Sequence, residues 1–124
     1  MSGPQKSPEQ VIPLTHLTYH VLLALAKEPL HGYGIIKEIE ASTSGELELE
    51  TGTLYAAIRR MNDEGLLDHV APPAASGVDA RRRYYGLTPF GRSVLLLESQ
   101  RLVRLLGIAE QKQIIQNLGL ARPE

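Results

Sequence analysis

Two groups of arginines give the sequence its clearest chemistry. Arg59 and Arg60 form the first group, and Arg81, Arg82 and Arg83 form the second, further along the chain. A guanidinium binds a phosphate or a guanine edge through two parallel hydrogen bonds. An isolated arginine pair is more often an ordinary solvated helix face. The denser second group favours nucleic acid, because concentrated positive charge attracts the phosphate backbone.

The histidines offer a weaker alternative, a metal site or an enzyme. His16 and His20 are four residues apart, a spacing that can bind a metal on a helix. Leu17 stands where a metalloprotease has glutamate, and no third ligand is evident. We expect His31 to cap or pack a helix. The sequence therefore predicts no enzyme, no cofactor and no metal.

Composition limits the remaining classes. The chain has 124 residues, of which 43% are hydrophobic, and it has no cysteine, so its stability must come from packing in one domain. Residues 1–10 lack the apolar run of a secretory signal, and no stretch reaches the ~20 apolar residues of a membrane span. We expect a cytoplasmic protein. The net charge of -1 opposes nucleic-acid binding in general, so DNA contact would rest on local charge.

Two amphipathic segments predict the first two helices. Thr15 can cap the first, and Pro29 closes it, because proline lacks the amide donor and clashes with the preceding turn. The second covers residues 31–41, with its isoleucines on one side and charged residues on the other. Tyr33 and Lys37 of this helix are candidates for phosphate contacts, although a core tyrosine and a solvated lysine fit equally well.

A short strand and a third helix are predicted next. Residues 46–50 alternate strictly between glutamate and leucine, which is typical of a half-buried strand. Thr51 can cap a helix that extends to Glu64, and at about 100° per residue its apolar positions fall in one arc. The remaining surface carries groups that suit bases and phosphates. We expect DNA contacts from Thr51, Gly52, Thr53, Tyr55, Ala56, Arg59 and Arg60.

A hairpin and a last helix complete the predicted elements. Residues 67–71 and 82–87 read as two strands joined by a loop over 72–80, which places Arg81, Arg82 and Arg83 where a wing would meet the DNA backbone. Thr88 can cap the last helix, with Pro89 at its first position.

The last helix has more apolar residues than its own domain can bury, which favours a second copy of the chain as partner. Gly107 leaves open one long helix or two shorter ones, and Gly119 is a plausible stop. We expect dimer contacts from Leu95, Leu102, Val103, Leu105, Leu106 and Ile114.

Three helices with a short strand before the third and a hairpin after it form the winged helix-turn-helix arrangement. The predicted class is therefore mainly α with a small β-wing, plus a C-terminal dimerisation helix. We divide the chain into a flexible arm at 1–13, a winged helix-turn-helix domain at 14–88 and the dimerisation helix at 89–120. In that fold the third helix enters the major groove of DNA, while neighbouring elements contact the sugar-phosphate backbone.

The chain also resembles the PadR family of transcriptional regulators. The resemblance is carried by LHGYG at 30–34, by TGTLY at 51–55 followed by Arg59 and Arg60, and by RRYYGLTPFG at 82–91. It implies a repressor that acts as a homodimer on a two-fold symmetric operator of double-stranded DNA. It also implies that the first helix, with Leu17, joins the dimer contact. The family often has proline at the positions of Thr51 and Ala56 and a basic residue at that of Gly86.

Some members of that family bind small hydrophobic effectors between their subunits. This chain has no tryptophan to stack on such a ligand, so an effector site here would be aliphatic.

A rival hypothesis is a winged-helix module that binds a protein. Glu46, Glu48 and Glu50 lie beside the proposed reading helix, and their field would oppose phosphate if they faced the groove. Loss of binding as salt rises would favour DNA.

Overall fold

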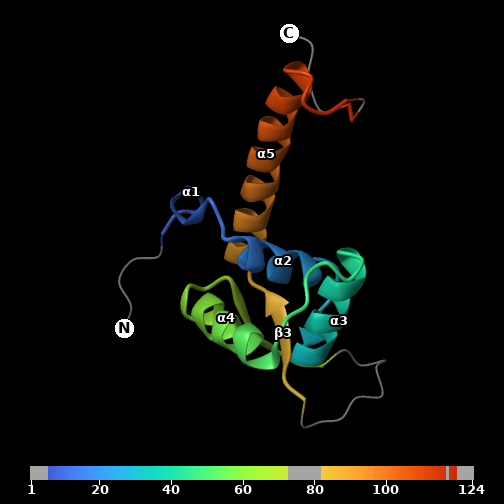
Figure 1. The fold of residues 1–124 in the computed structure, drawn as a ribbon. Coiled ribbons are helices and arrows are strands. Elements are labelled where there is room, and N and C mark those ends of the chain that lie inside the picture. Colours follow the sequence, from blue (N-terminus) through green and yellow to red (C-terminus); the bar gives the residue numbers. More distant parts are fainter. Residues whose placement is uncertain (1–5, 73–81, 117, 120–124) are drawn as a thin grey trace.

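A small helical domain carries a three-stranded sheet, and one long helix rises from it (Figure 1). The computed structural model describes residues 6–72, 82–116 and 118–119. The described elements are α1 (Pro8–Val11), α2 (His16–Ala24), β1 (Leu30–His31), α3 (Gly32–Ser42), α4 (Thr51–Asp63), β2 (Leu67–Val70), β3 (Tyr84–Leu87) and α5 (Pro89–Gln111). The predicted class, mainly α with a small β-wing, is confirmed.

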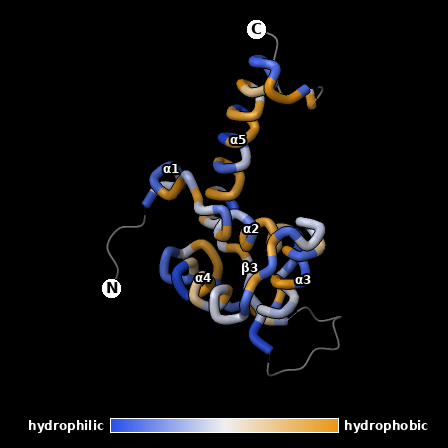
Figure 2. Tube along the Cα trace, in the orientation of Figure 1, coloured by the Kyte–Doolittle hydropathy of each residue, from blue (hydrophilic) through white to orange (hydrophobic). Residues whose placement is uncertain are grey.

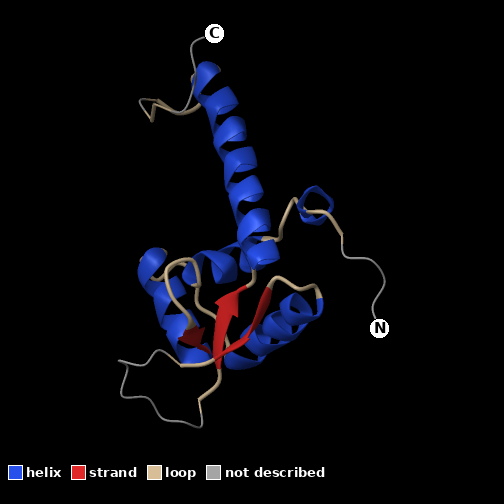
Figure 3. Ribbon diagram, turned by 180° about the vertical axis from the view of Figure 1, so that it is seen from behind, coloured by secondary structure: helices blue, strands red, loops and turns tan. Residues whose placement is uncertain are grey.

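The sheet is antiparallel in the order β1-β3-β2, and Figure 3 shows it from behind. β2 and β3 form the predicted hairpin, with Leu67 opposite Leu87 and Val70 opposite Tyr84. The third strand is β1, in which His31 pairs with Tyr84. Sequence reasoning did not find β1, because a strand of two residues has no periodicity of its own.

The helix caps follow the predictions for α2, α3 and α5. The Thr15 hydroxyl accepts a hydrogen bond from the Thr18 amide at 3.2 Å, and His31 Nδ1 accepts one from the Gly34 amide at 3.0 Å. The Thr88 hydroxyl accepts from the Gly91 amide at 2.9 Å. Each cap satisfies an amide that the first helical turn leaves without a partner.

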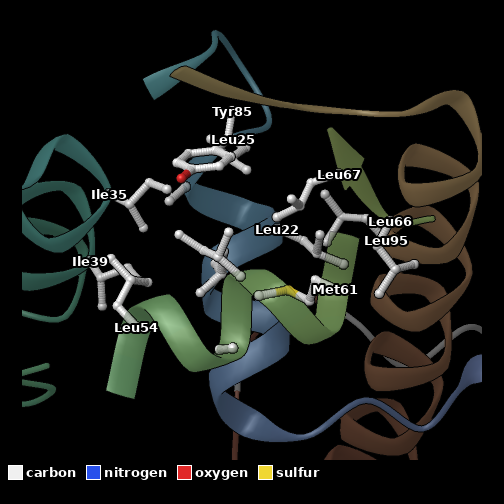
Figure 4. Close-up of a cluster of buried hydrophobic side chains, with 14 of the residues drawn as sticks. Leu22, Leu25, Ile35, Ile39, Leu54, Met61, Leu66, Leu67, Tyr85 and Leu95 are labelled. Atoms are coloured by element: carbon white, nitrogen blue, oxygen red, sulfur yellow. The ribbon is translucent and has the colours of Figure 1, made fainter. Parts of the chain in front are cut away.

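The core lies where α2, α3 and α4 meet the sheet and the beginning of α5 (Figure 4). Removal of these apolar side chains from water is the main force holding the domain together. Val94 and Leu95 of α5 belong to this core, and Leu95 is only 7% exposed. Leu95 is therefore unavailable for the dimer contact expected of it, since the chain's own domain already covers it.

Residues 46–50 do not form the predicted strand. Their alternation is present, because Leu47 and Leu49 are half-buried while the three glutamates are exposed, but the segment pairs with no strand. The place beside β3 is taken by β1. α4 then begins at Thr51 with Glu50 as its N-cap, so Thr51 is the first helical residue and not the cap.

α4 and α5 both end in a left-handed residue. After α4, Gly65 has φ of 79°, and the Leu66 amide bonds to the Met61 carbonyl at 2.9 Å. After α5, Gln113 has φ of 64°, and the Ile114 amide bonds to the Ala109 carbonyl at 2.9 Å. Both are Schellman arrangements.

α5 is therefore one helix through Gly107, and it ends at Gln111, well before the stop expected at Gly119. Ile114 lies beyond the helix and is 77% exposed.

The expected N-terminal arm contains an element that the sequence did not predict. α1 begins after Ser7 with proline in its first turn, and it packs against α5. The Leu14 amide further ties this segment to α5, because it donates to the Glu98 carboxylate at 2.8 Å. Residues 1–5 lie outside the described part of the chain.

Two negative findings apply to the residues described. Among them, no helix has both the length and the apolar run needed to cross a bilayer. In the same residues, histidines and carboxylates nowhere gather in a group of three that could hold a metal ion.

Candidate nucleic-acid interface

All seven residues of α4 that are predicted to contact DNA are exposed, and five of them lie on its outward side. Thr51, Gly52, Thr53, Ala56 and Arg59 are all exposed, while the opposite side of the helix is buried in the core. The N-cap, Glu50, makes no side-chain hydrogen bond to the helix. The first internal bond runs from the Leu54 amide to the Glu50 carbonyl at 3.0 Å. The amides of the first turn are therefore free to donate to an outside acceptor, such as a phosphate.

The other two predicted residues of α4 also make contacts inside the molecule. A guanidinium nitrogen of Arg60 donates to the Thr18 hydroxyl of α2 at 3.3 Å. The hydroxyl end of Tyr55 lies over Gly32, the first residue of α3. These contacts position α4 against α2 and α3. The helical periodicity of α4 alone could not predict these two contacts, because each partner lies on another helix.

α3 presents an aromatic ring in its first turn and a cation one turn further along. Tyr33 is 57% exposed, and the Lys37 ammonium lies 5.2 Å from the centre of its ring. The hydrogen bond and charge interaction with Tyr33, followed by the nearby Glu40, raise the pKa of Lys37. Both side chains face solvent, which rules out the alternative of a core tyrosine at position 33, and Lys37 stays charged.

The base of the wing meets the same end of α3. Arg82 and Arg83 are exposed just before β3, and Arg82 Nη1 lies 2.8 Å from Nε2 of His31. The His31 ring also packs edge-on against Tyr84 and parallel to Tyr33. The third wing arginine of the prediction, Arg81, lies outside the described residues.

These parts come together at one end of the domain. Figure 1 shows the N-terminal ends of α3 and α4 and the start of β3 at the end away from the rising α5. The contact of Tyr55 with Gly32 joins α4 to α3, and the pairing of β1 with β3 places the start of β3 beside them. We call this surface the basal face, and it consists of Tyr33, Lys37, Thr51, Gly52, Thr53, Ala56, Arg59, Arg82 and Arg83.

The acidic residues that motivated a protein-binding alternative flank this surface. Glu46, Glu48 and Glu50 are exposed in the segment that leads into α4. Their carboxylates reduce the positive potential near the start of the helix. The cations of the basal face must outweigh them for DNA to approach.

A second unusual surface lies on the distal part of α5. Figure 2 shows apolar positions along this helix where it stands away from the domain. Of the residues expected at a dimer contact, Val103, Leu105 and Leu106 are exposed, whereas Leu102 is half-buried and Leu17 of α2 packs partly against the core. The structure adds Leu96 and Ile108, which are also exposed.

Sequence reasoning missed the place of His31 and the role of Glu98. The capping of α3 by His31 follows from its position, but its contact with Arg82 depends on the pairing of β1 with β3. Glu98 is 2% exposed and accepts hydrogen bonds from Arg101 at 2.6 and 2.9 Å. The three-residue spacing of Glu98 and Arg101 indicates an ion pair on a helix, but nothing in the sequence indicates that Glu98 is buried.

The sequence matches a family of transcriptional regulators, and the fold matches solved structures of such regulators. The family model "Transcriptional regulator PadR-like family" matches residues 21–96. An uncharacterized 37.1 kDa protein in transposon TN4556 of Streptomyces fradiae is 42% identical over 87 residues. That match covers 70% of this chain but 23% of the relative, so the chain spans about a quarter of the relative's length.

The solved structures that share the fold include two regulators with more than 25% identity to this chain. A PadR family transcription regulator from hypervirulent Clostridium difficile R20291 has a TM-score of 0.64 and 27% identity, over 79% of this chain and 98% of that one. A PadR-like transcription factor from Bacteroides fragilis has a TM-score of 0.62 and 28% identity, over 77% of this chain and 87% of that one.

Proposed function

Because this chain belongs to the PadR-like family of transcriptional regulators, we propose that it binds double-stranded DNA through the basal face and regulates transcription as a homodimer. The members of that family are DNA-binding regulators and not enzymes, in agreement with the prediction from the sequence. The observation that carries the proposal is the convergence of the first turn of α4 with the cations of α3 and the wing base.

α4 is the element that fits the major groove. Thr53, Ala56 and Arg59 lie on its exposed side, where a hydroxyl, a small apolar group and a guanidinium can contact base edges. Lys37, Arg82 and Arg83 surround that helix and suit the backbone phosphates. We assign Tyr55 and Arg60 to positioning α4, because their side chains contact Gly32 and Thr18.

The distal α5 supports the homodimer. Leu96, Val103, Leu105, Leu106 and Ile108 are large apolar side chains exposed on one element, which is typical of a surface that a partner covers. A second copy would present the same helix, because a two-fold interface uses the same surface on both subunits. The operator would then be two-fold symmetric, with half-sites separated by ~34 to 36 Å or a multiple. We further propose that the bound dimer represses transcription by occupying its operator. We also propose that a small hydrophobic effector binds among these aliphatic side chains of α5.

A titration of labelled duplex DNA tests the proposal. The duplex is taken from the region upstream of this protein's own coding sequence, and binding is followed by fluorescence anisotropy at several salt concentrations. We expect binding to weaken steeply with salt, because bound cations release counterions from the phosphates. Arg59→Ala should cost about 1 to 3 kcal/mol on the specific sequence if Arg59 contacts guanine, and should weaken all sequences equally if it contacts phosphate.

Lys112→Ala is the matched control, because it removes one exposed cation after the end of α5, far from the basal face. Equal effects of Arg59→Ala and Lys112→Ala would contradict the proposal. Absence of duplex binding at low salt would favour the second candidate, a module that binds a basic protein through the exposed Glu46, Glu48 and Glu50.

A further inference from the structure

The contact between His31 and Arg82 cannot be an ordinary hydrogen bond while His31 caps α3. Nδ1 of His31 accepts from the Gly34 amide at 3.0 Å, so in the neutral ring the proton is on Nε2. Arg82 Nη1 lies 2.8 Å from that Nε2. A guanidinium has donors only, so two donors face each other. Among the described residues, His31 is the only recorded partner of the Arg82 guanidinium.

An oxyanion resolves this arrangement, because one anionic oxygen can accept from both donors. We propose that His31 and Arg82 together bind one phosphate of the DNA backbone, His31 through the Nε2–H of its neutral ring and Arg82 through its guanidinium. The inference rests on the proposed function and adds His31 to the DNA-contacting residues. The pair lies between the exposed Tyr33 of α3 and the start of β3, on the basal face.

The surroundings of His31 favour its neutral form. Burial and the charge of Arg82 lower the pKa of His31. The groups that face the ring are Arg82, Tyr84 and Tyr33, with Lys37 beyond Tyr33, so no carboxylate among the described contacts opposes this shift. Protonation of Nδ1 would also remove the acceptor for the Gly34 amide. His31 therefore donates to phosphate without adding a charge.

Two substitutions separate the capping role of His31 from phosphate binding. Asparagine is a strong N-cap but is too short to replace Nε2, so His31→Asn should keep the melting temperature near wild type and weaken DNA binding about tenfold or more. Glutamine carries a donor near the position of Nε2 but caps poorly. His31→Gln should lower the melting temperature and keep most of the affinity.

The salt dependence distinguishes the two members of the pair. Arg82→Ala should flatten the slope of log K against log salt by about one unit, because a cation that neutralised a phosphate is lost. His31→Asn should leave that slope unchanged, because a neutral donor releases no counterion. Combined, the two substitutions should cost less than the sum of their separate effects, since both side chains bind the same phosphate.

The outcomes separate this inference from the proposed function. If wild type binds no duplex, the proposed function fails, and the phosphate assignment fails with it. If wild type binds and His31→Asn, while folded, binds equally well, only the inference is overturned. Nitrogen-15 NMR of the His31 ring in phosphate-free buffer gives a direct readout, in which Nε2 should shift on addition of duplex. A response to inorganic phosphate with none to duplex would also overturn it.

Discussion

The hydroxyl end of Tyr55 lies directly over Gly32, so the second turn of α4 rests on the first residue of α3. A side chain at position 32 would occupy the space of the tyrosine ring. This contact lies where the N-terminal ends of the two helices meet on the basal face, in addition to their packing in the core. The glycine of the LHGYG motif is thus explained by close approach of α4.

Replacement of Gly32 by alanine should therefore destabilise the protein. We expect the free energy of unfolding to fall by about 1 to 3 kcal/mol, the usual cost of overpacking, as measured by urea denaturation. In a Tyr55→Ala background the same replacement should cost much less, because the obstructing ring is gone. Gly52→Ala is the control, since Gly52 has open space around it in α4 and alanine there should be neutral or stabilising. Wild-type stability of Gly32→Ala would show that the contact is loose.

Gly91→Ala should be more damaging than Gly32→Ala. A methyl group at position 91 would meet the backbone carbonyl of Leu66, which cannot rotate aside as a side chain can. The same junction holds the Thr88 hydroxyl, which donates to the Gly65 carbonyl. Thermal unfolding should show a larger loss than for Gly32→Ala, up to failure to fold. Ser93→Ala, at an exposed position of the same helix, should stay within about 0.5 kcal/mol of wild type.

Stability should fall in acid because of Glu98. The hydrogen bonds from Arg101 hold the pKa of Glu98 below its ordinary value of 4.5, against the opposing effect of burial, and the Leu14 amide assists. A folded-state pKa below the unfolded one means that this stabilisation is complete above about pH 4.5 and is lost as pH falls through the lower, folded value.

Glu98→Gln should be about 1 to 3 kcal/mol less stable than wild type at pH 7 and should show a flatter decline below pH 4.5. Urea denaturation as a function of pH provides the measurement, with Glu46→Gln as the control at an exposed carboxylate. Parallel pH profiles for Glu98→Gln and wild type would contradict this role.

Leu106→Glu should separate the homodimer without unfolding the subunit. Leu106 is exposed in the single chain, so a charge there costs little until a partner covers it. Sedimentation at micromolar concentration should give a dimer for wild type and a monomer for the variant, with unchanged far-ultraviolet circular dichroism. Gln100→Glu adds the same charge at another exposed position of α5 and is the control. A monomeric wild type would refute the dimer.

The sequence predicted the elements with strong local signals. Thr15 and Thr88 cap as expected, and Leu54, Ile58 and Met61 face the core at helical spacing. The failures share a cause, because they depend on partners distant in the sequence. The alternating residues 46–50 lack a neighbouring strand.

The candidate site was predicted to a similar extent. The exposure of Arg59 and Arg60 follows from the helical periodicity of α4, whereas the hydrogen bond of Arg60 depends on Thr18 of another helix. The end of α5 was misplaced because Gln113, a residue less typical than glycine of left-handed backbone, ends the helix before Gly119.

Amide exchange in the first turn of α4, measured by NMR with and without the operator duplex, tests the placement of DNA most directly. The amides of Thr51, Gly52 and Thr53 precede the first internal hydrogen bond of α4, so they should exchange rapidly in the free protein. We expect duplex DNA to slow the exchange of these three amides strongly. Exchange in the distal part of α5 should not change, provided that the fraction of dimer is the same in both samples. Unchanged exchange at these three amides, with protection appearing on α5 instead, would contradict the account.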